Sequence, residues 1–168
     1  MKQLAIFITV AFVSIIDASS TFAIEQPKSI SLGTNNSTTD TQIISAEFGL
    51  INNPNSENPE FVPTKNVPLV ENQEYGWVIR LKTNKPTVKW REELILPEAP
   101  AIWDSSEIKG KFTLSEDRKT SIIEREVTPN QGLIINSWLI APGDPKGKYI
   151  IHVFIENLMV KTFEFDVE

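Results

Sequence analysis

The feature that most constrains this 168-residue chain is a succession of short runs rich in Val, Ile, Thr and aromatic residues. Pro, Asn, Gly and Asp separate these runs and favour turns. Runs of this kind are typical of β-strands. We predict strands at residues 42–51, 64–71, 75–83, 86–96, 109–115, 119–128, 131–140, 147–156 and 158–167. The segment 98–108 could hold one short helical turn, and no other stretch has a convincing period near 3.6.

Alternation within the runs indicates how the strands are buried. Tyr75, Trp77, Ile79 and Leu81 share one face of their strand, as expected for a strand with one face in a core. The last two strands are separated only by Glu156-Asn157, a pair that favours a tight hairpin because Asn tolerates positive φ. We therefore predict an all-β fold, an antiparallel β-sandwich of about eight or nine strands.

A membrane-spanning barrel of the same strand count is disfavoured. Such a barrel needs a continuous apolar outer face. The strand around 87–94 carries Lys89, Arg91 and Glu93 on one face and Glu92 on the other. We expect a soluble two-sheet sandwich with no membrane insertion.

The first 40 residues differ from the rest. Lys2, an apolar run over 4–16 and Ala23 after small and polar residues follow the order of a secretory signal peptide. The run of about 13 apolar residues is shorter than the roughly 20 that span a bilayer. We expect a signal peptide at 1–23, a flexible leader at 24–40 and the sandwich domain at 41–168, exported as a free soluble protein to the periplasm or the extracellular medium.

Composition excludes several classes of function. The net charge is −6, with no cysteine in the chain, and the isoelectric point is near 4.9. Nucleic acids and anionic membrane surfaces require a positive surface, so neither is expected as a partner. The lack of cysteine excludes disulfides, thiol catalysis and thiolate metal sites.

The closing stretch carries a family resemblance. Residues 141–155 contain a Pro/Gly turn followed by Gly147-Lys148-Tyr149, and residues 161–167 alternate as Thr-Phe-Glu-Phe. This resembles the last hairpin of bacterial immunoglobulin-like domains, and the layout of 41–167 is similar to small secreted bacterial immunoglobulin-like proteins. The resemblance implies a fold and an exported setting, without an activity.

No catalytic, metal-binding or cofactor-binding constellation is present. His152 is the single histidine, so a multi-histidine metal site is impossible, and we interpret it as a hydrogen-bonded sheet residue. Glu92 and Glu93 point to opposite faces of a strand and cannot flank one glycosidic bond. We assign no catalytic residue, no metal ligand and no cofactor.

Three residues are candidates for ligand binding: Trp90, Arg91 and Trp103. Trp90 is expected either to stack on a ligand while Arg91 binds a carboxylate, or to fill the core while the charges pair on the wet face. Trp103 lies in a Pro-rich loop and either contacts a ligand or closes the end of the sandwich. Trp77 and Trp138 are expected in the core.

These observations favour a non-catalytic exported β-sandwich that binds another envelope protein or itself. The alternative is a carbohydrate-binding module that uses an exposed tryptophan. A hydrolase with an unrecognised site has the least support, and His152 and Glu93 are the only residues whose substitution would test it.

Overall fold

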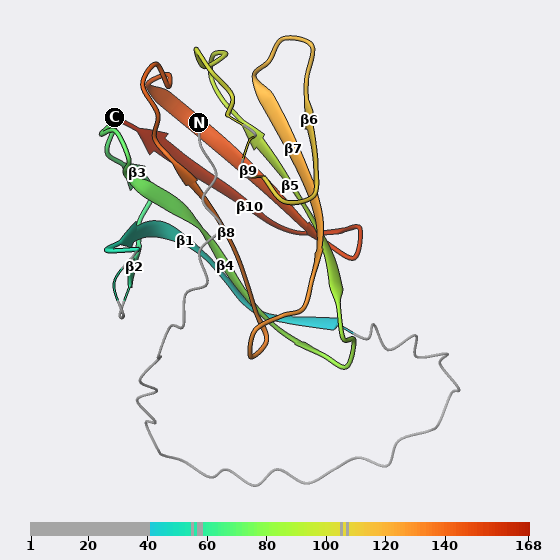
Figure 1. Cartoon of the computed structure of the whole chain (residues 1–168). Helices are drawn as coiled ribbons and strands as arrows, with labels where there is room; N and C mark the ends of the chain where they lie inside the picture. Colours follow the sequence, from blue (N-terminus) through green and yellow to red (C-terminus); the bar gives the residue numbers. More distant parts are fainter. Residues whose placement is uncertain (1–40, 55, 57–58, 105, 107) are drawn as a thin grey trace, which may run out of the picture.

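The computed structural model describes residues 41–54, 56, 59–104, 106 and 108–168, and every regular element in these ranges is a β-strand (Figure 1). The predicted signal peptide (1–23) and leader (24–40) lie outside the described residues. The strands are β1 (Thr41–Asn52), β2 (Glu60–Pro63), β3 (Asn66–Val67), β4 (Glu74–Thr83), β5 (Val88–Ile95), β6 (Lys111–Leu114), β7 (Thr120–Val127), β8 (Leu133–Leu139), β9 (Gly147–Ile155) and β10 (Leu158–Val167).

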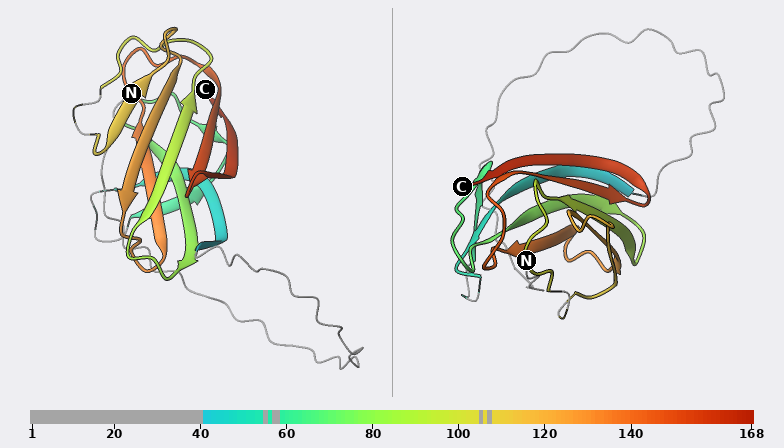
Figure 2. Two further views of the ribbon diagram at one scale, coloured as in Figure 1. Left: turned by 90° about the vertical axis from the view of Figure 1, so that its right-hand side faces the viewer. Right: turned by 90° about the horizontal axis from the view of Figure 1, so that it is seen from above.

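The strands form two sheets that pack face to face (Figure 2). The first sheet has the order β2-β1-β4-β8, and the second has the order β3-β10-β9-β5-β7-β6. Neighbouring strands are antiparallel except β3, which runs parallel to β10. The predicted all-β sandwich is confirmed. No helix in the described part of the chain is long and apolar enough to cross a membrane.

The segment before β4 differs from its prediction. One strand was expected at 64–71 after an irregular loop at 52–63. The structure instead has two short strands there, and β2 lies within the expected loop. β2 pairs with β1 in the first sheet, whereas β3 pairs with β10 in the second. The chain therefore crosses between the sheets at Thr64-Lys65, and Pro68 ends the second strand because it has no N–H to donate. The described part of 98–108 contains no helical turn.

The predicted hairpin between β9 and β10 is confirmed. Leu158 pairs with Ile155, so the turn consists of two residues. Glu156 has φ 51° and Asn157 has φ 66°. Positive φ at both central residues is the conformation whose twist matches that of the flanking strands.

The core between the sheets is aromatic. Trp77, Tyr75, Trp138 and Phe165 are each fully buried. Phe48 of the first sheet stacks on Phe165 of the second with ring centroids 4.2 Å apart. Burying a large apolar side chain contributes about 1.5–3 kcal/mol, so packing of this kind can hold the sheets together in a chain without cysteine.

The connection from β8 to β9 is fixed by two side chains. The Tyr149 hydroxyl donates to the carbonyl of Pro145 at 2.7 Å, the arrangement known as a tyrosine corner in immunoglobulin-like sandwiches. The Asp144 carboxylate accepts the backbone N–H of Ala141 at 2.8 Å. Both contacts lie within the Pro/Gly-rich turn and set the point at which the chain enters β9.

Candidate functional site

The structure does not bring the three predicted ligand-binding residues together. Trp90 is 2% exposed and meets Trp77 edge to face with ring centroids 5.4 Å apart. Arg91 lies on the opposite face of β5, where its guanidinium stands 4.3 Å from the centre of the Phe154 ring. It also donates to the Glu93 carboxylate at 2.5 Å.

Trp103 is half-buried at one end of the sandwich. Its ring meets Trp138 edge to face with centroids 5.9 Å apart. Its indole N–H donates to the carbonyl of Arg118 at 2.8 Å. The ring packs against the core here, with its polar atom bonded within the protein.

His152 and the acidic residues form no metal site in the described part of the chain, where no group of three or more potential ligands occurs. The His152 Nδ1 lies 2.8 Å from the Thr162 hydroxyl of the neighbouring strand. The ring is half-buried on the outer face of the second sheet. This is the hydrogen-bonded sheet position that the sequence predicts.

A buried carboxylate, which sequence reasoning did not single out, joins the two sheets. Glu92 of β5 is 0% exposed. Its Oε1 accepts the Trp138 indole N–H at 2.6 Å, and its Oε2 accepts the Asn136 amide at 2.9 Å and the Trp77 indole N–H. Burial raises the pKa of Glu92 above its ordinary value, and these donors offset part of that rise. With neutral donors and no solvent access, the cluster links strands rather than forming a reactive site.

One flank of the sandwich is open. β1 and β10 lie side by side there (Figure 2, right), with the rings of Phe48 and Phe163 5.9 Å apart. Among the described residues, no strand pairs with the outer edge of β1 before Gly49 or with that of β10 before Asp166. We call the segments Thr41–Phe48 and Leu158–Phe165 the open flank.

The backbone direction along this flank follows from two hydrogen bonds. The N–H of Asp166 donates to Lys65 on the outer side of β10 at 2.8 Å, and the carbonyl of Phe48 accepts the N–H of Thr64 at 3.3 Å. Because backbone groups alternate along a strand, the N–H and C=O groups of Thr162, Glu164 and Ala46 also point outward.

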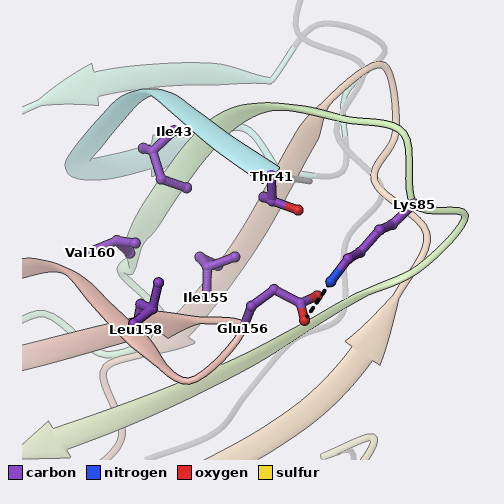
Figure 3. Close-up of a pocket in the computed structure, with 7 residues that line it drawn as sticks. All are labelled: Thr41, Ile43, Lys85, Ile155, Glu156, Leu158 and Val160. Atoms are coloured by element: carbon purple, nitrogen blue, oxygen red, sulfur yellow. Dashed lines mark hydrogen bonds and ion pairs between the residues drawn. The ribbon is translucent and has the colours of Figure 1, made fainter. Parts of the chain in front are cut away.

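A pocket of about 330 Å³ lies at one end of the open flank (Figure 3). Its apolar wall combines β1 with the β9–β10 hairpin. The polar part of its rim is the Thr41 hydroxyl and an ion pair between Lys85 and Glu156 at 3.0 Å. The lining side chains are Thr41, Ile43, Lys85, Ile155, Glu156, Leu158 and Val160. Farther along the same two strands, a groove of about 540 Å³ runs between residues 46–48 and 161–164.

The pocket depends on irregularities in both edge strands. Strand pairing shifts between Ile43 and Ser45 on β1 and between Met159 and Lys161 on β10. Each shift is a β-bulge, which redirects the neighbouring side chains. Ile43 and Val160, next to or within the bulges, line the pocket, whereas the extra residue Ile44 is 53% exposed.

Glu156 fixes the floor of this end of the sandwich. Besides its ion pair with Lys85, its carboxylate accepts the backbone N–H of Lys89 at 3.2 Å, and its own N–H donates to the carbonyl of Lys89 at 2.9 Å. These partners hold the pKa of Glu156 below its ordinary value, with the Lys85 hydrogen bond as the largest cause. The turn is therefore anchored to β5 by a charged carboxylate.

Comparisons with known proteins identify the fold. An immunoglobulin-like protein from Pseudomonas aeruginosa is similar in structure, with a TM-score of 0.52 and 16% identity, over 79% of this chain and 100% of that protein. A Pseudomonas fluorescens alkylpurine DNA glycosylase bound to DNA also matches, with a TM-score of 0.33 and 10% identity over 73% of this chain and 30% of that one. No curated protein is significantly similar in sequence.

The first of these structural matches covers the whole of a bacterial immunoglobulin-like protein, in agreement with the tyrosine corner and the parallel pairing of β3 with β10. The family model described as the PM0630 beta sandwich domain matches residues 46–168, which include all the strands from β2 to β10. The chain therefore belongs to the PM0630 beta sandwich domain family and has an immunoglobulin-like β-sandwich fold.

Proposed function

We propose that this chain is an exported, non-catalytic interaction module that binds an extended segment of another protein along the open flank. The observation that carries the proposal is the free outer edge of β10 beside an apolar pocket. An extended segment can add to such an edge as an extra strand. Its backbone would bond the outward groups of Thr162 and Glu164, and an apolar side chain would enter the pocket lined by Ile43 and Val160.

The surface near the pocket suits this role. Leu158 and Met159 are 61% and 60% exposed. Both lie at the start of β10, in the β9–β10 hairpin that forms one wall of the pocket. Exposed apolar side chains grouped beside a free strand edge mark a site of protein interaction. The bulges at both edges limit the length over which a foreign strand can pair, which favours a short partner segment over open-ended association.

Glu164 provides a sharp test, because its side chain is exposed and its N–H points outward. Glu164→Pro removes both the side-chain charge and the backbone N–H. Glu164→Ala removes the same charge but keeps the backbone N–H. A photoreactive residue at Lys161 would be used to capture partners in the envelope fraction of the source cells, with the same residue at Lys111 on β6 as a positional control.

We expect one defined adduct from position 161 with the wild-type and Glu164→Ala proteins, reduced at least about tenfold by Glu164→Pro, which is the effect of losing one or more backbone hydrogen bonds. An adduct of equal yield in both variants would contradict strand addition at β10. An adduct that forms equally from position 111 would contradict the choice of flank.

Export is part of the proposal and rests on the basic, apolar and small-residue order of residues 1–23. N-terminal sequencing of the protein recovered from cells should give Ile24 as the first residue. Recovery of an intact Met1 from the cytoplasmic fraction would contradict export. The carbohydrate-binding alternative has less support. Trp90 is 2% exposed, and Trp103 packs on Trp138 with its indole N–H bonded to the Arg118 carbonyl.

A further inference from the structure

Two arginines of the second sheet stand over aromatic rings, but only one of them has a carboxylate partner. Arg91 lies over Phe154 and also forms an ion pair with Glu93. Arg125 lies over Trp90, 5.5 Å from the ring centre. Within the described part of the chain, no carboxylate lies within 4.0 Å of the Arg125 guanidinium.

Arg125 is also withdrawn from water. It follows Ile123 on the inward-facing side of β7 and is half-buried, opposite Trp90 in the pairing of β5 with β7. Burial lowers the pKa of its guanidinium, although an arginine stays charged at any ordinary pH. A partly desolvated charge without a counter-ion is costly, and buried charges are normally paired. An anion that binds here would supply the missing partner.

A pocket of about 270 Å³ receives this charge. It is lined by Trp90, Arg125 and Lys89, together with Arg91, Gly110, Glu124, Glu126 and Asn157. Asn157 borders this pocket. The preceding residue, Glu156, lines the separate apolar pocket of the open flank.

The acidic residues in the lining already have partners. Glu124 accepts from the Lys111 ammonium at 2.6 Å. Glu126 accepts from the Thr87 hydroxyl at 2.5 Å, a neutral partner that leaves the charge of Glu126 in place opposite Lys89. Arg91 is neutralised by Glu93. Arg125 and Lys89 have no ion pair among the described residues. With Glu124 and Glu126 set against Lys89, Arg91 and Arg125, the lining keeps one net positive charge in a chain of net charge −6.

We propose that this pocket, formed by Trp90, Arg125 and Lys89, binds a small organic carboxylate. The planar guanidinium fork matches the two oxygens of a carboxylate. The Trp90 ring is almost fully buried beneath the guanidinium, so it supports the fork from the core side rather than contacting the ligand. The site is independent of the open flank, because none of its three principal residues borders the apolar pocket or the groove.

The test uses the ¹⁵N-labelled protein with benzoate, benzamide and inorganic phosphate as probes. Benzamide has the shape of benzoate without its charge, and phosphate is an anion without the planar shape or the apolar body. Binding is followed by NMR at the Arg125 side-chain Nε–H and the Trp90 indole N–H. Arg125→Met removes the guanidinium, and Arg118→Met is the matched control because Arg118 is exposed and does not border the pocket.

We expect benzoate to shift both signals saturably, with affinity lowered at least about tenfold by Arg125→Met and changed less than about twofold by Arg118→Met. Benzamide should bind at least about tenfold more weakly than benzoate to the wild-type protein, a comparison that needs no variant to fold. Equal binding of benzamide, absence of saturable shifts, or equal loss in both arginine variants would overturn the site. Phosphate binding as tight as that of benzoate would overturn its assignment to carboxylates.

Discussion

Glu92 shows how a charged residue type can be part of a hydrophobic core. Its two oxygens accept hydrogen bonds from two indoles of β4 and β8 and from one amide, all from the opposite sheet. A buried polar group that is hydrogen-bonded in this way costs little, but a donor left without its acceptor costs about 1–3 kcal/mol. The cluster therefore makes the pairing of the sheets depend on one side chain.

Replacing Glu92 by glutamine tests this dependence. A glutamine has one acceptor oxygen in place of two, so one buried N–H is left facing an NH₂ group. We expect Glu92→Gln to lower the free energy of unfolding by about 1–3 kcal/mol at pH about 5, measured by urea denaturation. The control Glu93→Gln, on the outer face, should change it by less than about 1 kcal/mol. Equal effects of the two substitutions would contradict the structural role of Glu92.

The raised pKa of Glu92 also predicts a pH dependence. Because the pKa in the folded state lies above the unfolded value near 4.5, its contribution to stability is fully present below that value. The contribution is lost as the pH rises through the folded-state pKa. The stability advantage of the wild type over Glu92→Gln should therefore shrink as the pH rises above about 4.5.

Burial likewise raises the pKa of Glu74 and of Asp144, but these two groups are common to both proteins and cancel in the difference. An advantage that stays constant or grows with pH would contradict the raised pKa of Glu92.

Sequence reasoning did not identify Glu92 as a core residue. The alternation of β5 places it on the same face as Trp90, which is the buried face in the structure. Its donors Trp77, Asn136 and Trp138 come from strands 15 to 46 residues away. A carboxylate at a core-facing position is the sequence feature that could have indicated this role. The identity of its hydrogen-bond donors, however, depends on how the two sheets pack.

At the scale of the elements, the tyrosine corner fixes the entry of β9. Tyr149→Phe keeps the buried ring and removes only the bond to the Pro145 carbonyl. We expect it to lower the free energy of unfolding by about 0.5–1.5 kcal/mol, measured by thermal or urea denaturation. An unchanged stability would show that the hydroxyl contact is not needed to hold this turn.

The free edge of β10 predicts an unusual tolerance of proline. Glu164→Pro should keep the fold, with a loss within about 1 kcal/mol, because the N–H that it removes has no strand partner. Glu93→Pro, at the centre of the second sheet between β9 and β7, should cost about 3 kcal/mol or more because it removes a bond between strands. Circular dichroism with urea denaturation compares the two. Unfolding by Glu164→Pro would contradict a free edge.

The elements that sequence reasoning placed well are those with strict alternation. β4, β5 and the β9–β10 hairpin lie within two residues of their predicted bounds. The region before β4 was harder to predict because β2 and β3 have four and two residues and belong to different sheets. Strands this short carry almost no periodic signal, and they form because β1 and β10 offer them an edge.

At the scale of the whole molecule, the sandwich class could be predicted and its binding surfaces could not. A cysteine-free chain with regularly spaced apolar strands must bury them against one another. The open flank, however, arises where β1 and β10 meet across more than 100 residues of chain, and the carboxylate pocket arises where Arg125 meets Trp90. The residues predicted to bind ligand included Trp90, but the structure pairs it with Arg125 rather than with Arg91.

The most direct measurement of the proposed function is amide hydrogen exchange of the ¹⁵N-labelled protein, alone and with the envelope fraction of its source cells. In the isolated protein the N–H of Glu164 should exchange rapidly, because its edge is free, while that of Asp166, bonded to Lys65 at 2.8 Å, is protected. With a partner strand on β10, the Glu164 N–H should become protected and that of Asp166 should change little. An N–H of Glu164 that is already protected in the isolated protein, or that stays exposed when a partner binds, would contradict strand addition at the open flank.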